Sequence, residues 1–308
     1  MKEKNTQTAL RRVVLVLAVI ALVMSATLAA LLARKALRGR DETPPETAAP
    51  AGETPAPASD APESVAAQAA DVQKLFDDFV AAQGGTWDLY YESLTTGETA
   101  SARCGHDSEP RSVAASLIKL YVMGAVYDAV ARGTLTHDAV YQSVYSMITA
   151  SDNDACNRLV TMLGGGDPVK GMQAVNAFAA SIGCTGTQMN RLMLQPGTEN
   201  FVTASECGAM LRLIYRGACV SADASAEMLT ILKAQTVNDR IPASLPQGTA
   251  VAHKTGNLIN LSCGDAGIVL APGGDYILCA IANHEPSDAQ ATSAIATLSR
   301  TVYNAVTA

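Results

Sequence analysis

The sequence is poor in charged residues, in aromatic residues and in histidine. Charged residues make up 17% of the 308 positions and aromatic residues 5%, and there are only four histidines. No histidine lies within four residues of another or in a Cys/His cluster with ligand spacing, so the sequence predicts no metal site and no cofactor. The body of the chain has no run of Lys or Arg and the net charge is −7, which disfavours a nucleic-acid partner.

The sequence also lacks the G-x-S-x-G turn that carries the nucleophile of many Ser-His-Asp hydrolases. This absence disfavours a hydrolase of that kind. We interpret His253 as a packed core residue of the sheet rather than as a catalytic base.

One stretch is strongly apolar. Residues 13–33 follow a short tail over 1–12 and carry no charge, and a helix of about 21 residues is long enough to span a bilayer. We therefore predict a transmembrane signal anchor over 13–33. A cleaved signal peptide is the alternative, because small residues suited to a peptidase occur near 25–30. Basic residues occur equally on both sides, so they do not set the orientation.

The next segment, 34–67, is a predicted linker. Its part from 41 to about 65 is rich in Pro, Ala and Glu and has no periodic apolar residues, so it cannot bury enough surface to fold. We expect this linker to hold a monomeric domain over 68–308 on the extracytoplasmic side of a bacterial cell membrane. If the N-terminal segment is cleaved, the domain is expected to be secreted.

Residues 68–308 alternate between helical and strand periods. Strands are predicted at both ends of this body, and residues 113–230 are predicted to be almost wholly helical. The predicted fold is α/β with an inserted all-α lobe, in which an antiparallel sheet of about five strands is flanked by helices. Where the lobes meet we expect a cleft. The predicted strands are 86–94, 98–104, 249–256, 265–271 and 275–282, between helices at 66–84 and 287–306.

The first motif in this body is Ser116-x-x-Lys119, on a predicted helix that is apolar nearly all round. Residues three apart share one helix face, so the hydroxyl and the amine are neighbours. A desolvated lysine has a lowered pKa and can accept the proton of a serine nucleophile. The alternative is a first-turn lysine that reaches solvent.

Two further motifs follow. Ser151-Asp152-Asn153 lies between two predicted helices, where an ordinary helix N-cap is the alternative explanation. Lys254-Thr255-Gly256 ends a predicted strand, and its glycine allows another molecule to approach the backbone closely. An ordinary strand end is the alternative there.

The order S-x-x-K, S-D-N, K-T-G, each in its expected helix, loop or strand, is the signature of one enzyme superfamily. The body from about 70 to 308 resembles the class A serine β-lactamases and the related penicillin-binding peptidases. The resemblance implies a β-lactamase/transpeptidase-like fold, with a helical lobe packed on an α/β lobe built from both chain ends. This implication agrees with the layout predicted above.

The resemblance also implies roles for the motif residues. Ser116 is the implied nucleophile that forms an acyl-enzyme, and Lys119 takes its proton. Ser151 relays a proton to the leaving nitrogen, and Asn153 holds Lys119 and the substrate amide. Lys254 and Thr255 are implied to bind the substrate carboxylate, and the backbone N–H groups of Ser116 and Asn257 to form the oxyanion hole; Gly256 completes the implied substrate-binding set.

The sequence departs from the family where deacylation is concerned. Active class A enzymes carry a Glu-x-x-Leu-Asn element whose carboxylate activates the deacylating water. The corresponding region here has no acid between Cys184 and Thr198. Its first carboxylate, Glu199, has two explanations: with Asn200 it closes the end of this loop, or it reaches the cleft and serves deacylation.

These features predict a β-lactamase-like serine hydrolase that forms an acyl-enzyme with β-lactams. Hydrolysis of that acyl-enzyme is expected to be slow if no carboxylate serves deacylation. A membrane-anchored D-alanyl peptidase, or a module that binds β-lactams or peptidoglycan with little turnover, is the alternative. A fold kept only for packing is a third interpretation.

The seven cysteines are an odd number, so at least one has no partner within the chain. We expect Cys156, Cys207 and Cys279 to be buried small hydrophobic residues rather than reactive thiols. The sequence does not determine any pairing.

Overall fold

The computed structural model describes residues 61–308, apart from 84, 107, 108 and 286, and these residues belong to one compact unit. The predicted tail, membrane span and most of the predicted linker lie outside the described residues. Among the described residues, no helix is both long and apolar enough to cross a bilayer.

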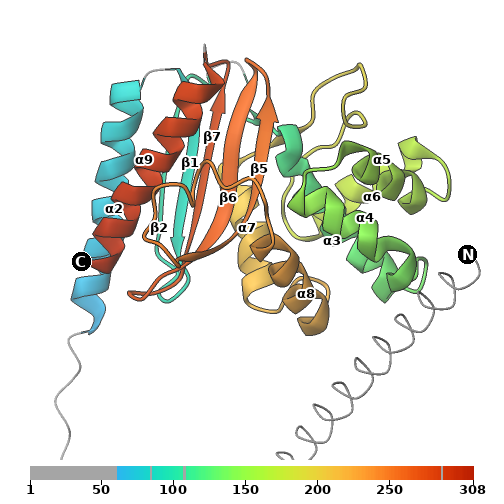
Figure 1. Cartoon of the computed structure of the whole chain (residues 1–308), viewed down its shortest axis with the longest axis horizontal. Helices are drawn as coiled ribbons and strands as arrows, with labels where there is room; N and C mark the ends of the chain where they lie inside the picture. Colours follow the sequence, from blue (N-terminus) through green and yellow to red (C-terminus); the bar gives the residue numbers. More distant parts are fainter. Residues whose placement is uncertain (1–60, 84, 107–108, 286) are drawn as a thin grey trace, which may run out of the picture. The chain divides into compact units, whose positions relative to one another are not determined.

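A five-stranded antiparallel sheet forms the centre of the molecule (Figure 1). Its order is β2-β1-β7-β6-β5, so the two N-terminal strands pair with three strands from the C-terminal end. The central pairing is between β1 and β7, where Leu89 lies opposite Ala280. The strands are β1 (Thr86–Ser93), β2 (Thr99–Cys104), β5 (Ala250–Leu258), β6 (Ser262–Leu270) and β7 (Tyr276–Asn283).

Helices cover both faces of the sheet (Figure 1). The first and last described helices, α2 (Ala61–Gln83) and α9 (Asp288–Thr307), pack on one face around a core that includes Phe76, Trp87 and Leu298. The inserted helices share a second core that includes Leu117 and Tyr121; α7 and α8 pack against the other face of the sheet, and α3 to α6 pack mainly against one another. These helices are α3 (Lys119–Ala131), α4 (His137–Thr149), α5 (Asn153–Leu163), α6 (Pro168–Ser181), α7 (Ala204–Tyr215) and α8 (Ala222–Lys233).

Side-chain caps fix where several helices begin. Asp152 accepts a hydrogen bond from the backbone of Ala155 at the start of α5, and Thr203 and Ser221 cap α7 and α8 in the same way. Such caps satisfy backbone N–H groups that have no partner within the helix. The Asp152 cap fixes the start of α5 directly after Ser151, which lines the cleft.

The predicted fold class is confirmed: the sheet uses both ends of the body and the helical lobe is inserted between them. The prediction of almost continuous helix over 113–230 is wrong in two places. A short sheet joins β3 (Ser112–Val113) to β4 (Phe201–Val202), and residues 182–200 form no helix. Gly183 and Gly197 have positive φ angles there, a conformation that ends helices.

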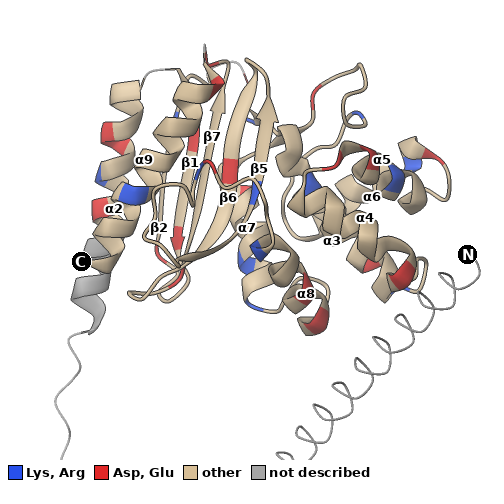
Figure 2. Ribbon diagram, in the orientation of Figure 1, with Lys and Arg blue, Asp and Glu red and all other residues tan. Residues whose placement is uncertain are grey.

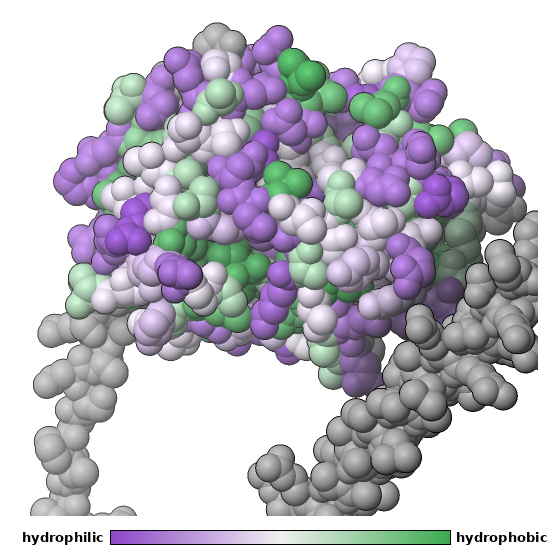
Figure 3. All heavy atoms as spheres, in the orientation of Figure 1, coloured by the Kyte–Doolittle hydropathy of each residue, from purple (hydrophilic) through white to green (hydrophobic). Residues whose placement is uncertain are grey.

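Figure 2 shows Lys and Arg scattered among Asp and Glu over the ribbon. Figure 3 shows a surface that is mostly hydrophilic or intermediate, with small hydrophobic areas. The exposed large apolar side chains are Tyr145, Val169, Leu194 and Ile259.

Candidate active site

Ser116 lies in a 3-10 helix, Ala115–Ile118, that precedes α3. The predicted single helix from Val113 is broken here, because Ala115 has a φ of 44° and Val113 belongs to β3. Ser116 is 8% exposed and lines a cleft of about 510 Å³ together with Ser151, Asn153 and Thr255. Within the described part of the chain its Oγ makes no hydrogen bond, so it is available to a bound molecule.

Lys119 is completely buried and begins α3. Its Nζ donates to the backbone oxygen of Ser151 at 2.6 Å, to Ser151 Oγ at 3.2 Å and to Asn153 Oδ1 at 2.7 Å. Burial lowers the pKa of Lys119 to about 8. The lysine does not reach solvent, and the three acceptors hold its amine at the edge of the cleft.

Lys254 approaches the same hydroxyl from the sheet. It is fully buried on β5, and its Nζ donates to Ser151 Oγ at 3.0 Å and to the backbone oxygen of Thr255 at 2.8 Å. Burial, together with the nearby Lys119, lowers the pKa of Lys254 to about 7. Two amines that share one acceptor repel each other when both are charged, which favours an uncharged amine near neutral pH.

Ser151 is held in an unusual backbone conformation. Its φ is 56°, in the left-handed region that non-glycine residues rarely adopt. This conformation turns both its hydroxyl and its carbonyl toward Lys119. Backbone strain of this kind is common where a side chain is positioned for function.

The strand edge supplies the opposite wall of the cleft. Thr255 and Asn257 line it, and they alternate with Lys254 and Gly256 along β5. A Cβ at Gly256 would lie 3.1 Å from the backbone oxygen of Ala114. The absent side chain therefore lets β5 pass close to the start of the 3-10 helix that carries Ser116, called the serine helix below.

Arg240, which the sequence analysis missed, also lines the cleft. Its side chain is 4% exposed and donates to Asp239 Oδ1 at 2.8 Å and to Asn257 Oδ1 at 3.0 Å. A guanidinium in this wall is suited to a planar anionic group such as a carboxylate. The nearest sequence signal was the Ile241-Pro242 dipeptide that follows it.

The loop over 190–200 closes on itself. Asn200 Oδ1 accepts hydrogen bonds from the backbone of Asn190 at 2.8 Å and of Arg191 at 3.0 Å. Glu199 forms an ion pair with Arg191 at 2.6 Å. Glu199 thus helps to close the loop, and it also lines a cavity of about 40 Å³ beside Ser116.

The structure thus brings the predicted residues from four elements to one cleft. Ser116 and Lys119 come from the serine helix and α3, Ser151 from the loop before α5, and Lys254 from β5. The side chains of Lys119 and Lys254 both donate to Ser151 Oγ. The catalytic roles of these residues stay predictions.

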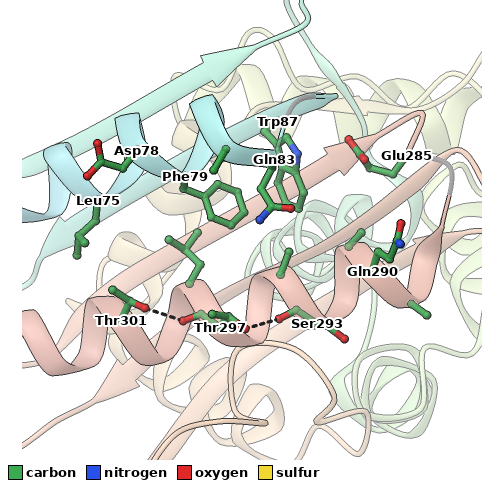
Figure 4. A pocket seen from close by; sticks show the side chains of 15 residues that line it. Leu75, Asp78, Phe79, Gln83, Trp87, Glu285, Gln290, Ser293, Thr297 and Thr301 are labelled. Atoms are coloured by element: carbon green, nitrogen blue, oxygen red, sulfur yellow. Dashed lines mark hydrogen bonds between the residues drawn. The ribbon is translucent and has the colours of Figure 1, made fainter.

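A larger cavity, about 870 Å³, lies away from this site, between α2 and α9 (Figure 4). Its floor is apolar, with Phe79 and Trp87, and its rim carries Thr297 and Thr301, whose hydroxyls bond to backbone oxygens of their own helix. No cluster of three or more possible metal ligands occurs among the described residues.

All seven cysteines are described and none forms a disulfide. The predicted burial of Cys156, Cys207 and Cys279 is confirmed, and each is fully buried. Burial raises the pKa of Cys156 to about 12, which keeps its thiol protonated and inert beneath Lys119.

A family model described as "Beta-lactamase enzyme family" matches residues 69–145 and 139–306. Among curated proteins, the chain is similar to β-lactamase FAR-1 of Nocardia farcinica, with 27% identity over 176 residues, which is 54% of each chain. The chain therefore aligns with about half the length of this curated relative.

Two solved structures cover more of the chain. One is a mutant of PBP-A as an acyl-enzyme complex with penicillin G, with 26% identity, a TM-score of 0.66, and 77% of this chain and 96% of that chain covered. The other is a β-lactamase from Sphaerobacter thermophilus, with 26% identity, a TM-score of 0.65, and 79% and 97% covered.

Proposed function

Because the chain belongs to the β-lactamase enzyme family, as the motif order predicted, we propose that it is a class A-like serine hydrolase that opens β-lactam rings through an acyl-enzyme on Ser116. The observation that carries this proposal is the sharing of Ser151 Oγ by two fully buried lysines beside an unbonded serine hydroxyl. Such an arrangement provides a nucleophile, a base and a proton relay in one cleft.

Acylation follows from these positions. Ser116 Oγ attacks the β-lactam carbonyl while its proton passes to the uncharged amine of Lys119. Ser151 Oγ, bonded to that amine, transfers a proton to the ring nitrogen as the C–N bond breaks. Lys254 and Arg240 attract the substrate carboxylate to the opposite side of the cleft.

Deacylation requires a water molecule and a base. The cavity of about 40 Å³ beside Ser116 has room for roughly one water molecule. Among the described residues, Glu199 is the one carboxylate that lines it, and an ion pair with Arg191 already engages that group. We therefore expect slow hydrolysis of the acyl-enzyme, since losing a positioned base typically costs about 10²- to 10⁴-fold in rate.

A D-alanyl peptidase is the second candidate. Two observations favour it: the loop before Glu199 has no acid, and the chain is similar over 77% of its length to PBP-A. In this reaction Ser116 would attack an acyclic D-alanyl peptide bond and the released amine would leave the cleft. If the acyl-enzyme formed but was hardly hydrolysed, the domain would act as a binding module with almost no turnover.

We further propose that the domain works as a monomer on the extracytoplasmic side of a bacterial membrane, attached by the predicted span over 13–33 and the predicted linker over 34–67. The uncharged run and the Pro-rich composition of the linker support this attachment.

The decisive experiment incubates the full chain with a chromogenic cephalosporin and follows both colour and intact mass. We expect a covalent adduct on the unmodified chain and slow colour release after the first equivalent, and neither with Ser116→Ala. Sustained fast turnover would show efficient deacylation. Absence of both an adduct and colour would overturn the proposed function.

A further inference from the structure

The segment from Asn238 to Ile241 carries Asp239 and Arg240 into the cleft, yet it lies outside every helix and strand. An irregular segment needs outside contacts to hold a charged side chain in one place. At Ile241 one such contact comes from α9, where Ser299 Oγ donates to the backbone oxygen of Ile241 at 2.9 Å.

The other contacts come from a buried acid and base behind β5. His253 is 1% exposed and Asp265 is fully buried, and His253 Nδ1 lies 2.9 and 3.0 Å from the two carboxylate oxygens. His253 lies next to Lys254 on β5, so the two side chains point to opposite faces of the sheet. Thr255, two residues along β5 and opposite Asp265 on β6, lies on the same face as this pair and lines the cleft, whereas His253 and Asp265 are themselves buried.

This pair contacts both ends of the segment. Asp265 Oδ2 accepts a hydrogen bond from the backbone of Ile241 at 3.1 Å. At the other end, Asn238 Nδ2 donates to the backbone oxygen of Gln235 at 3.2 Å, which leaves its Oδ1 as an acceptor. His253 Nε2, 3.0 Å from Asn238 Oδ1, must then carry a hydrogen and donate it.

We propose that His253 and Asp265 are positioning residues that hold Arg240 toward the carboxylate of the substrate. The inference rests on the proposed function for the identity of that carboxylate. Neither residue touches the substrate; both act by fixing the backbone on each side of Arg240. The guanidinium is then oriented by Asp239, Asn257 and Cys263 Sγ, to which its Nε donates at 3.3 Å, and each terminal nitrogen keeps one N–H group for a bound anion.

The test uses Asn238→Ala, because the side chain of Asn238 lies in an exposed loop and its loss spares the buried pair. Acylation rate constants are measured with a carboxylate-bearing cephalosporin and with its methyl ester. We expect a loss of about tenfold for the acid and less than about twofold for the ester. Asn238→Asp keeps an acceptor for His253 and should restore most of the rate.

A double-mutant cycle separates positioning from general destabilisation. Asn238→Ala should add almost nothing in an Arg240→Ala background, because the group it positions is gone. His137→Gln, an exposed histidine on α4 bonded to Glu227, serves as the matched control and should leave both rates unchanged. Equal losses for acid and ester, or full additivity in the double variant, would overturn the proposal.

A second measurement keeps this inference distinct from the proposed function. If neither substrate acylates the unmodified chain, the proposed function fails. The positioning role is then tested separately, by the rate at which backbone amide hydrogens of the segment exchange with solvent. Faster exchange at Arg240 and Ile241 in Asn238→Ala would support the hold on the segment. Unchanged exchange there would overturn it.

Discussion

At the scale of residues, the two buried lysines Lys119 and Lys254 supply amines that can exchange a proton near neutral pH. Both donate to Ser151 Oγ, and burial lowers the pKa of Lys119 to about 8 and of Lys254 to about 7. A lysine in water is almost never an effective base near neutral pH, whereas these two are close to losing a proton there.

Acylation is therefore expected to accelerate with pH. The uncharged fraction of Lys119 grows about tenfold per pH unit below its pKa and levels off above it. A carboxylate-free β-lactam is the right substrate, because its binding does not need the charge of Lys254. Stopped-flow rate constants between about pH 6 and 9 should rise and then level near pH 8; a flat profile would exclude Lys119 as the base.

Lys254 should lower the free energy of unfolding, although the proposed function needs it to bind the substrate carboxylate. Folding lowers its pKa, so the unfolded chain binds the proton more tightly and the penalty of burial is complete below about pH 7. The penalty shrinks as pH rises from about 7 toward the ordinary value of 10.5.

We expect Lys254→Met to raise the free energy of unfolding by about 1 to 4 kcal/mol at neutral pH and to abolish acylation. The gain should be larger near pH 6 than near pH 9. Denaturant unfolding at both pH values measures it, with Lys233→Met on the exposed end of α8 as the control. A variant less stable than the parent at pH 6 would contradict this account.

Residue spacing predicted part of the cleft and missed part of it. Ser116 and Lys119 are recognisable because a three-residue separation in a helix is a local feature. Arg240 was not predicted, because it enters the cleft only through an irregular segment held by His253 and Asp265. No local pattern encodes such long-range contacts.

At the scale of elements, the loop over 190–200 decides how long the acyl-enzyme lasts. Its two ends are joined by Asn200, which is 3% exposed, and by the ion pair of Glu199 with Arg191. The prediction that residues 113–230 are almost wholly helical did not allow for the length of this irregular stretch, although the resemblance implied a loop that Glu199 and Asn200 close. In the structure Met193 in this loop and Met189 just before it are both buried in the core that the inserted helices share.

Glu199→Gln tests whether this loop supplies a base. Because the carboxylate is paired with Arg191, we expect the deacylation rate to change by less than about threefold. The rate is read from the disappearance of the acyl-enzyme mass after excess β-lactam is removed. A decrease of about 10²-fold or more would identify Glu199 as the deacylating base.

Asn200→Ala tests the closure of the loop. The substitution leaves the N–H groups of Asn190 and Arg191 without their acceptor, and we expect a loss of about 1 to 3 kcal/mol in the free energy of unfolding. Asn200→Asp keeps an acceptor and should lose much less. Equal stability of the Ala and Asp variants would show that these hydrogen bonds do not stabilise the loop.

At the scale of the whole molecule, the sheet requires both ends of the body before it can form. Its central pair joins β1 to β7, so β1 has no second partner until the last strand is made. The alternating patterns at both ends of the body predicted this arrangement. The register, such as Leu89 opposite Ala280, could not be predicted because it depends on pairing across most of the chain.

The proposed membrane attachment gives a prediction for the full chain. In a bacterial host it should stay in the membrane fraction after an alkaline wash, because residues 13–33 are uncharged. Leu22→Arg combined with Val23→Arg should release it. A soluble, shortened unmodified chain would instead indicate a cleaved signal peptide.

The central claim is that the hydroxyl of Ser116 becomes acylated in a cleft built around Ser151 Oγ. Peptide mapping by mass spectrometry after a brief exposure to penicillin G tests it most directly. We predict that the penicilloyl group is found on Ser116 in the unmodified chain and on no residue in Lys119→Met. A penicilloyl group on any other side chain, or undiminished acylation of Lys119→Met, would contradict this account.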